Sequence, residues 1–258
     1  MRKTLLFMMS ILLLLSVIGC STADKSASGE KELIVGIDDK FAPMGFRDEK
    51  NEIVGFDIDY ARATVEKMGY KVKFQPIDWK TKESELMSGR IDLIWNGYTI
   101  TEDRVEKVLF SKPYLKNSQV VAVKADSDIH KISDLAGKNV GLQGLSSAAD
   151  ALDANEIKSQ IKSVTEFADN VLALSDLKNG RVDAVIIDEV VIDYYMAKEE
   201  GTYKLLEDSL APEEYGVGVK KGREDLLKEL QTALDALNSD GTSAEISKKW
   251  FGEDKVLK

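Results

Sequence analysis

Residues 88–104 read SGRIDLIWNGYTITEDR, and residues 179–189 repeat the pattern as NGRVDAVIIDE. In each stretch a Gly-Arg pair precedes an apolar run with the continuous hydrophobicity of a buried parallel strand. The two glycines, Gly89 and Gly180, are placed to end a preceding helix in the left-handed conformation. The repeat therefore predicts two α/β units of similar construction. Structural hydrogen bonds to a local turn or a neighbouring helix are expected from two aspartates inside the repeat, Asp92 and Asp183.

The sequence around these stretches continues the alternation of strands and helices. Short β-branched runs such as LIVGI (33–37) and SQVVAVKA (118–125) alternate with helical segments such as 56–69. This alternation implies parallel sheets with right-handed crossovers. Single strands are expected at IDLIWN (91–96) and EEYGVGVK (213–220), and a short helix at SDLAGK (133–138).

Two lobes fit the repeat better than one long sheet. The chain has only four prolines and no long linker, so we expect the lobes to be joined by strands near 115–121 and 211–217. The fold class predicted is α/β and two-lobed, with a mainly parallel sheet flanked by helices in each lobe. The first lobe is expected at 32–117 together with 215–258, and the second at 118–214.

The N-terminal residues predict export and lipid attachment. A basic start and the apolar run LLFMMSILLLLSVI have the arrangement of a secretory signal peptide, expected over residues 1–19. The sequence VIGC at 17–20 resembles a bacterial lipobox, in which cleavage before Cys20 is followed by attachment of diacylglycerol to its thiol. An ordinary cleaved signal is the alternative. Residues 20–31 are then a flexible tether, and the protein is held at the outer face of the cytoplasmic membrane.

Composition excludes several functional classes. The formal net charge is −10, and it becomes −12 without residues 1–19, which carry two basic residues and no acidic one. An acidic surface repels phosphate backbones, so we expect no nucleic-acid partner. Cys20 is the only cysteine, and a thiol that carries a lipid leaves none for a disulfide or a metal, so we expect neither. We also expect no cofactor.

Polar residues follow both repeated strands, where ligands of open α/β sheets bind. Asn96, Gly97 and Thr99 follow the first strand, with Arg104 on the next helix, and Asp188 ends the second strand. Arginine grips a carboxylate with two parallel hydrogen bonds, and an aspartate can pair with an ammonium group. If the two strand ends face each other across a cleft, they are complementary to an α-amino acid. Taken alone, Arg104 reads equally well as an exposed residue and Asp188 as a helix N-cap.

GFDIDYARATVEKMG at 55–69 resembles the signature segment of the family 3 solute-binding proteins, the amino-acid receptors of ABC importers. It departs at Tyr60, where an aliphatic residue is usual. The resemblance covers nearly all of residues 32–252 and includes LIVGIDDKFAPMGF, GYTITEDR, LFSKPY, DLAGKNVG, GRVDAVIIDE and DGTSAEISKKWFG. It implies a periplasmic-binding-protein fold of type II whose lobes close on a polar amino acid. It also implies a receptor without enzymatic activity that delivers its ligand to the permease and ATPase subunits, expected as a monomer.

The resemblance implies contacts to the ligand's α-groups. Arg104 matches the arginine that binds the α-carboxylate, and Asp188 matches the acid that binds the α-ammonium. Ser147 falls at the start of a second-lobe helix whose N–H groups also meet the carboxylate, and Ser146 is the alternative in LQGLSSAAD. The remaining α-group positions are Asn96 and Thr99, together with Gly97, which lets the ligand approach the backbone.

The resemblance also implies a pocket for the ligand's side chain. Phe41 and Trp79 fall where paired aromatic residues hold it, and Asp38 where an acid reads a polar or cationic group. Ordinary core packing is the alternative for the two aromatic residues. Arginine, lysine, histidine or glutamine suits this pocket best, an acidic ligand suits it least, and cystine is the alternative because cystine receptors share much of the pattern.

Two other functional classes are alternatives to a transport receptor. Enzymes of the same fold, such as dehydratases, need a positioned acid or base. The only histidine, His130, lies in the polar stretch SDIHKIS and is expected to be exposed, which leaves carboxylates as the candidate bases. A sensor module would need a separate signalling partner.

Overall fold

The computed structural model describes residues 31–258, and residues 32–258 form one compact unit. The predicted signal peptide, Cys20 and all of the predicted tether except Lys31 lie outside the described residues. Within the described part of the chain, no helix is long and apolar enough to cross a membrane.

The first sheet has five strands in the order β5-β1-β6-β14-β7. β1 (Glu32–Ile37) is parallel to β5 (Lys71–Pro76) on one side and to β6 (Leu93–Ile94) on the other. β14 (Gly218–Lys220) lies antiparallel between β6 and β7 (Val108–Phe110). The sheet is therefore mixed, with its parallel pairs at one side and its antiparallel pairs at the other.

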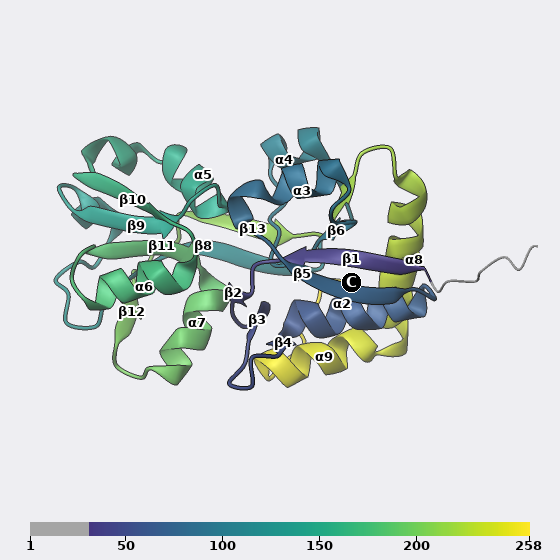
Figure 1. Ribbon diagram of the computed structural model, residues 1–258. Helices are drawn as coiled ribbons and strands as arrows, with labels where there is room; N and C mark the ends of the chain where they lie inside the picture. The colour runs from purple at the N-terminus through teal and green to yellow at the C-terminus, as the bar shows by residue number, and fades with distance from the viewer. Residues whose placement is uncertain (1–30) are drawn as a thin grey trace, which may run out of the picture. The chain divides into compact units, whose positions relative to one another are not determined.

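Helices cover both faces of this sheet (Figure 1). α2 (Phe56–Lys67) packs against β5 and contacts α8 (Glu224–Asp240) and α9 (Thr242–Phe251). α3 (Lys82–Ser88) and α4 (Glu102–Lys107) lie on the opposite face. Side chains of β1 alternate between the two layers, as the pleat requires: Leu33, Val35 and Ile37 pack in the cluster of Phe56, and Ile34 packs in the cluster of Leu86.

The second sheet has the order β10-β9-β11-β8-β12, and β13 also pairs with β8. β9 is parallel to β10 and to β11, whereas β8 is antiparallel to all of its neighbours, so this sheet is also mixed. Its strands are β8 (Leu115–Lys124), β9 (Asn139–Gln143), β10 (Ser163–Phe167), β11 (Ala184–Asp188), β12 (Tyr203–Leu205) and β13 (Ala211–Tyr215).

Smaller elements complete the fold. Three α-helices pack against the second sheet: α5 (Ser147–Asp153), α6 (Asn170–Lys178) and α7 (Glu189–Lys198). A three-stranded sheet joins β2 (Lys40–Phe41), β3 (Gly45–Arg47) and β4 (Ile53–Val54). Short 3₁₀ helices are η1 (Trp79–Thr81), η2 (Ile132–Leu135) and η3 (Glu156–Gln160).

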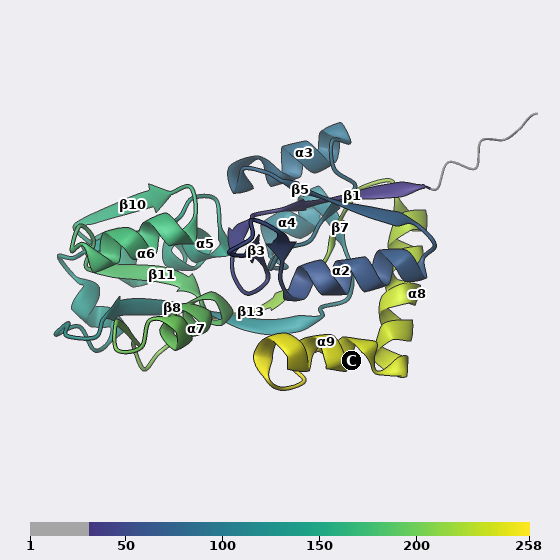
Figure 2. The same ribbon diagram turned by 60° about the horizontal axis from the view of Figure 1, so that its bottom comes forward.

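The chain passes between the two main sheets twice, once from β7 to β8 and once from β13 to β14. β8 and β13 pair antiparallel from Leu115↔Tyr215 to Gln119↔Ala211, so the two passages lie side by side. Figures 1 and 2 show this pair of strands between the elements of the two sheets. The prediction of two α/β lobes is confirmed. Apart from the connecting strands β8 and β13, the first sheet with its helices forms the first lobe, and the second sheet with its helices forms the second lobe.

Both copies of the repeated stretch build the same connection. α3 ends at Gly89 with φ 78°, and Gly180 follows α6 with φ 70°. Asp92 accepts a hydrogen bond from the backbone N–H of Ile34 at 2.8 Å, and Asp183 accepts one from that of Asn139 at 2.7 Å. The two aspartates are thus structural as predicted, but they bind the neighbouring strand instead of a local turn or helix.

Three predicted elements differ from the structure. The strand expected at 91–96 is confined to Leu93–Ile94, because the backbone after it turns at Gly97, where φ is 59°. The strand expected at 213–220 is two strands in different sheets, since the chain leaves the second lobe at this point. The helix expected at 133–138 is the 3₁₀ helix η2, Ile132–Leu135.

Candidate functional site

Arg104 is buried behind the end of β6, with 4 % of its surface exposed. Thr101 caps α4 by accepting a hydrogen bond from the Arg104 N–H at 3.2 Å, which fixes the start of the helix. The guanidinium lies 4.8 Å from the centre of the Tyr98 ring, and Nη1 donates to the Thr99 carbonyl at 2.9 Å. No carboxylate of the described residues lies within ion-pair distance of it. Within that part of the chain, Arg104 is therefore not an exposed helix residue but a buried cation without an anion.

The turn after β6 is shaped by Gly97 and Asp57. Gly97 has φ 59°, and its N–H donates to the buried carboxylate of Asp57 at 2.7 Å. Burial raises the pKa of Asp57 to about 7, against hydrogen bonds from the Gly97 N–H and the Tyr114 hydroxyl that lower it. A methyl group on Gly97 would lie 2.6 Å from the ring of Phe41, so any larger residue at this position would collide with the ring. Asn96 is also buried and donates to the Asp38 carbonyl at 3.3 Å.

Asp38 sits in the loop after β1 and is buried. Its carboxylate accepts from the Gln143 side chain at 2.7 Å and from the Lys40 N–H at 3.0 Å. Burial raises the pKa of Asp38 to about 6. Gln143, at the carboxyl end of β9 in the second lobe, was not predicted, although the rule that polar residues at strand ends form sites would have found it.

The two candidate serines have different partners. Ser146 is the N-cap of α5: its hydroxyl accepts from the Ala149 N–H at 3.4 Å and donates to the Gln143 carbonyl at 2.7 Å. The Ser147 hydroxyl instead accepts from Thr99 of the first lobe at 3.0 Å and from Gln119 at 3.2 Å. Ser147 therefore faces the predicted site, and Ser146 holds the helix end.

Asp188 ends β11 and is buried, with 5 % of its surface exposed. It occupies the N-cap position of α7, but its side chain makes no capping hydrogen bond. Its carboxylate accepts instead from Asn117 at 3.0 Å and from the Tyr215 hydroxyl at 2.5 Å. Burial, and then the nearby charge of Glu213, raise the pKa of Asp188 well above its ordinary value. Among the described residues it has no lysine or arginine partner.

The two aromatic candidates are buried but are not brought together as a pair. Trp79 packs edge to face against Tyr98, with ring centres 6.0 Å apart, and Phe41 belongs to the larger core cluster. No ring contact joins Phe41 and Trp79 in the part of the chain described. Beside Trp79 lies Lys82, which was not predicted and whose pKa is lowered to about 8 by burial and by Arg104.

Hydrogen bonds between the lobes surround these residues. Thr99 meets Ser147 and Asp38 meets Gln143. Lys82 donates to the Leu145 carbonyl at 2.9 Å. Two ion pairs lie near them, Lys40–Asp169 at 2.8 Å and Lys80–Glu166 at 3.5 Å. The predicted site residues of the two lobes are thus in direct contact.

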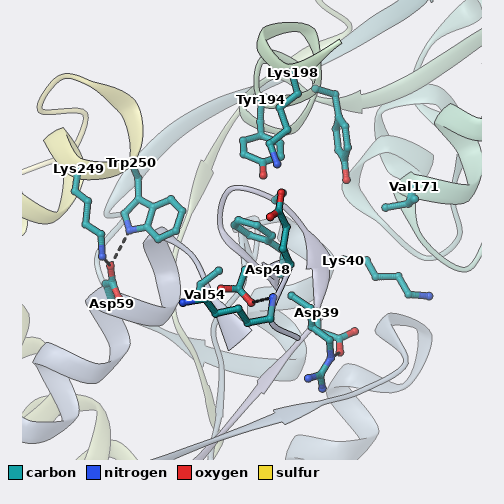
Figure 3. A pocket seen from close by; sticks show the side chains of 16 residues that line it. Asp39, Lys40, Asp48, Val54, Asp59, Val171, Tyr194, Lys198, Lys249 and Trp250 are labelled. Carbon is teal, nitrogen blue, oxygen red and sulfur yellow. Dashed lines mark hydrogen bonds and ion pairs between the residues drawn. The ribbon is translucent and has the colours of Figure 1, made fainter. Parts of the chain in front are cut away.

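A separate pocket of about 1010 Å³ lies between the small sheet, α7 and α9 (Figure 3). The Phe46 ring lies 5.4 Å from that of Tyr194 and 5.9 Å from that of Trp250. Lys249 and Trp250 both bind the Asp59 carboxylate, as the dashed lines show. None of the nine predicted ligand-binding residues lines this pocket.

His130 is exposed, as expected, and the carboxylates of the site are engaged by amide and hydroxyl donors. Across residues 31–258, no group of three or more histidine, cysteine, aspartate or glutamate side chains is arranged to hold a metal ion.

Comparison with known proteins gives one consistent family. The family model for bacterial extracellular solute-binding proteins, family 3, matches residues 33–253. The L-cystine-binding protein TcyJ of Escherichia coli strain K12 is 30% identical over 98% of this chain and 96% of its own length. The arginine-binding extracellular protein ArtP of Bacillus subtilis strain 168 is 29% identical over 99% of this chain and 100% of its own.

A solved structure is similar to this chain in both sequence and fold. The substrate-binding protein of an ABC uptake transporter from Streptococcus pneumoniae, crystallised with bound histidine, is 43% identical to this chain. The two folds superpose with a TM-score of 0.85 over 88% of this chain and 95% of that one. The two-lobed α/β fold is therefore shared.

Proposed function

Because the chain belongs to the bacterial extracellular solute-binding proteins of family 3, we propose that it binds an L-amino acid between Arg104 and Asp188 and delivers it to an ABC permease. Members of this family act as extracytoplasmic amino-acid receptors and not as enzymes, which confirms the prediction from sequence. The rival reading as a dehydratase finds no support.

One observation carries the proposed site. Among the described residues, Arg104 of the first lobe is a buried cation without an anion, and Asp188 of the second lobe is a buried carboxylate without a cation. Burying an unpaired charge is costly, so each group is suited to a ligand that brings the opposite charge. An α-amino acid carries both charges on neighbouring atoms. Ser147 and Thr99 meet between the lobes and supply hydroxyl groups for the end of the ligand that carries its α-groups.

We propose that the ligand's side chain is polar and carries hydrogen-bond donors. Asp38 and Gln143 form a buried polar pair, and Phe41 and Trp79 supply apolar surface for a methylene stem. With a pKa of about 6, Asp38 is largely ionised at neutral pH and can accept from a cationic or amide group. The three relatives compared bind cystine, arginine and histidine. Arginine, lysine, histidine and glutamine are therefore our candidates, and cystine is the alternative.

The location and boundaries are also proposals, supported by the sequence. A lipobox-like VIGC predicts cleavage after residue 19 and a diacylglycerol anchor on Cys20, with residues 20–31 as the tether. The body would act as a monomer at the outer face of the cytoplasmic membrane, beside permease and ATPase subunits. Its proposed lobes are 32–117 with 215–258, and 118–214.

A thermal-shift screen of the purified mature protein against the common amino acids and cystine tests the ligand class. We expect the largest rise in melting temperature with arginine, lysine, histidine or glutamine, because a ligand that binds only the folded state stabilises it. A rise with glutamate or aspartate alone would contradict the role assigned to Asp38.

A further inference from the structure

Two carboxylates, not one, stand at the Asp188 end of the site. Glu213 lies on β13, and the Asn117 side-chain amide of β8 donates both to it at 2.5 Å and to Asp188 at 3.0 Å. Gln119, also on β8, donates to the same oxygen of Glu213 at 2.9 Å. The strand register places Glu213 opposite Asn117 and Asp188 opposite Gln119, so three strands bring the two acids together.

The side chains that donate hydrogen bonds to this pair in the described residues are neutral: two amides and one hydroxyl. β13 contributes Glu213 and the Tyr215 hydroxyl, which donates to Asp188, and Tyr114 lies behind Tyr215 with its ring centre 6.4 Å away. β8 contributes only amides to the pair. Neither acid has a lysine or arginine within ion-pair distance in the part of the chain described. Asp188 is buried and Glu213 is half-buried, and negative charges on two acids bridged by one amide group repel each other, so a proton on Asp188 relieves the repulsion.

We propose that Asp188 is protonated beside the Glu213 side chain while the site is empty, and that the ligand's ammonium group displaces this proton into water. No covalent bond forms or breaks apart from the O–H bond of the carboxyl group, whose proton goes to solvent. The ammonium group then donates its own N–H groups to the ionised pair. The inference rests on the proposed function, because Asp188 must meet the ammonium group.

The direction of the raised Asp188 pKa supports this arrangement. Burial disfavours the ionised carboxylate most, and the charge of Glu213 and a hydrogen bond to it favour the protonated form. A bound ammonium group reverses both effects by supplying a positive charge. Glu213 is thus a positioning residue: together with burial, it favours the protonated form of Asp188 in the empty site.

Proton release makes affinity depend on pH. When binding releases one proton, the association constant rises about tenfold per pH unit. This rise holds below the pKa of Asp188 in the empty protein, and it levels off above that pKa. Removing the charge of Glu213 lowers the pKa of the empty site, so the steep range moves to lower pH.

Isothermal titration calorimetry of the full mature chain with glutamine, in two buffers of different ionisation enthalpy and at several pH values from acid to neutral, measures the protons released. Glutamine is the probe because its uncharged side chain leaves Asp38 without a cationic partner. We expect the wild type to release up to about one proton, and the pH range of this release to lie lower in Glu213→Gln than in the wild type. Glu214→Gln is the matched control, since strand alternation puts the next residue on the opposite face of β13, and it should release as much as the wild type.

Equal proton release from the wild type and Glu213→Gln at every pH would overturn the inference. If Glu213→Gln does not fold, the affinity of the wild type alone is measured across pH, and a flat profile from acid to neutral pH overturns it as well. If the wild type binds neither glutamine nor any other amino acid, the proposed function itself is wrong. Amino-acid binding without proton release at any of these pH values contradicts only the protonation of Asp188 in the empty site.

Discussion

Gly97 lies where the backbone after β6 passes the ring of Phe41. Its φ is 59°, and a methyl group there would stand 2.6 Å from the Phe41 ring and 3.3 Å from that of Tyr215. Its N–H is held by Asp57 at 2.7 Å, so the turn cannot easily move aside. At this residue the backbone conformation, the core and the predicted site depend on one another.

Gly97→Ala should lower the free energy of unfolding by about 2–4 kcal/mol, from the left-handed backbone and the collision with Phe41 together. Ligand affinity should fall as well, because the ring must move. Denaturant unfolding and calorimetric titration measure the two effects. Gly89→Ala is the control: its φ is 78°, but no atom lies within 4 Å of the added methyl group. Equal losses in the two variants would mean that the contact with Phe41 is unimportant.

Asp57→Asn tests a buried carboxylate whose folded-state pKa is raised from 3.8 to about 7. The folded protein holds this proton more tightly than the unfolded chain, so the contribution to stability is full below pH 3.8 and is lost as pH rises toward about 7. Asparagine does not ionise. Relative to wild type, Asp57→Asn should therefore gain up to about 1.4 kcal/mol of stability per pH unit across that window.

Urea denaturation at several pH values measures this difference. Asp59→Asn, two residues along α2, controls for removing a carboxylate from the same helix, because Asp59 binds Lys249 near the surface. Parallel stability curves for wild type and Asp57→Asn would contradict the raised pKa.

Among the elements, α5 shows how one helix start separates structure from binding. Ser146 caps the helix through the Ala149 N–H, and Ser147 points its hydroxyl at Thr99 of the other lobe. Ser146→Ala should cost about 1 kcal/mol of stability, the usual value of a lost N-cap. Ser147→Ala should change stability less and weaken amino-acid binding more. Thermal unfolding and calorimetric titration of both variants measure the two losses. A larger loss of stability in Ser147→Ala and a larger loss of affinity in Ser146→Ala would mean that the serines are assigned wrongly.

Local patterns in the sequence predict most elements of this fold. Gly89 and Gly180 are local signals of this kind, and both follow the end of a helix as predicted. The strand expected at 213–220 fails because its pattern is continuous while the chain changes sheets within it. A passage between lobes depends on contacts with distant strands, which a local pattern does not record.

The difference between local patterns and contacts of distant strands also explains which site residues the sequence predicts. Arg104, Asn96, Thr99 and Asp188 follow strands of the repeat, and the structure buries all four near the contact between the lobes. Glu213 could not be found in this way, because its place opposite Asn117 is set by the pairing of β13 with β8, 96 residues apart along the chain.

At the scale of the whole molecule, the two lobes meet through polar groups and leave an arginine and a carboxyl group without partners of opposite charge on the two sides. Thr99–Ser147, Asp38–Gln143 and Lys82–Leu145 join the lobes directly. Arg104 and Asp188 remain buried without partners of opposite charge among the described residues. A ligand carrying both complementary charges would favour this closed arrangement over an open one, because it binds the closed state better.

Calorimetric titration of the mature protein with its best ligand from the thermal screen, repeated with Arg104→Ala and Asp188→Ala, tests the central claim most directly. We predict that one amino acid binds per chain. Each variant should lose about 2–5 kcal/mol of binding free energy, because it leaves one charge of the bound ligand without a partner. Arg90→Ala is the control, because Arg90 pairs with Glu85 at the surface. Near-unchanged affinity in either Arg104→Ala or Asp188→Ala would contradict the site.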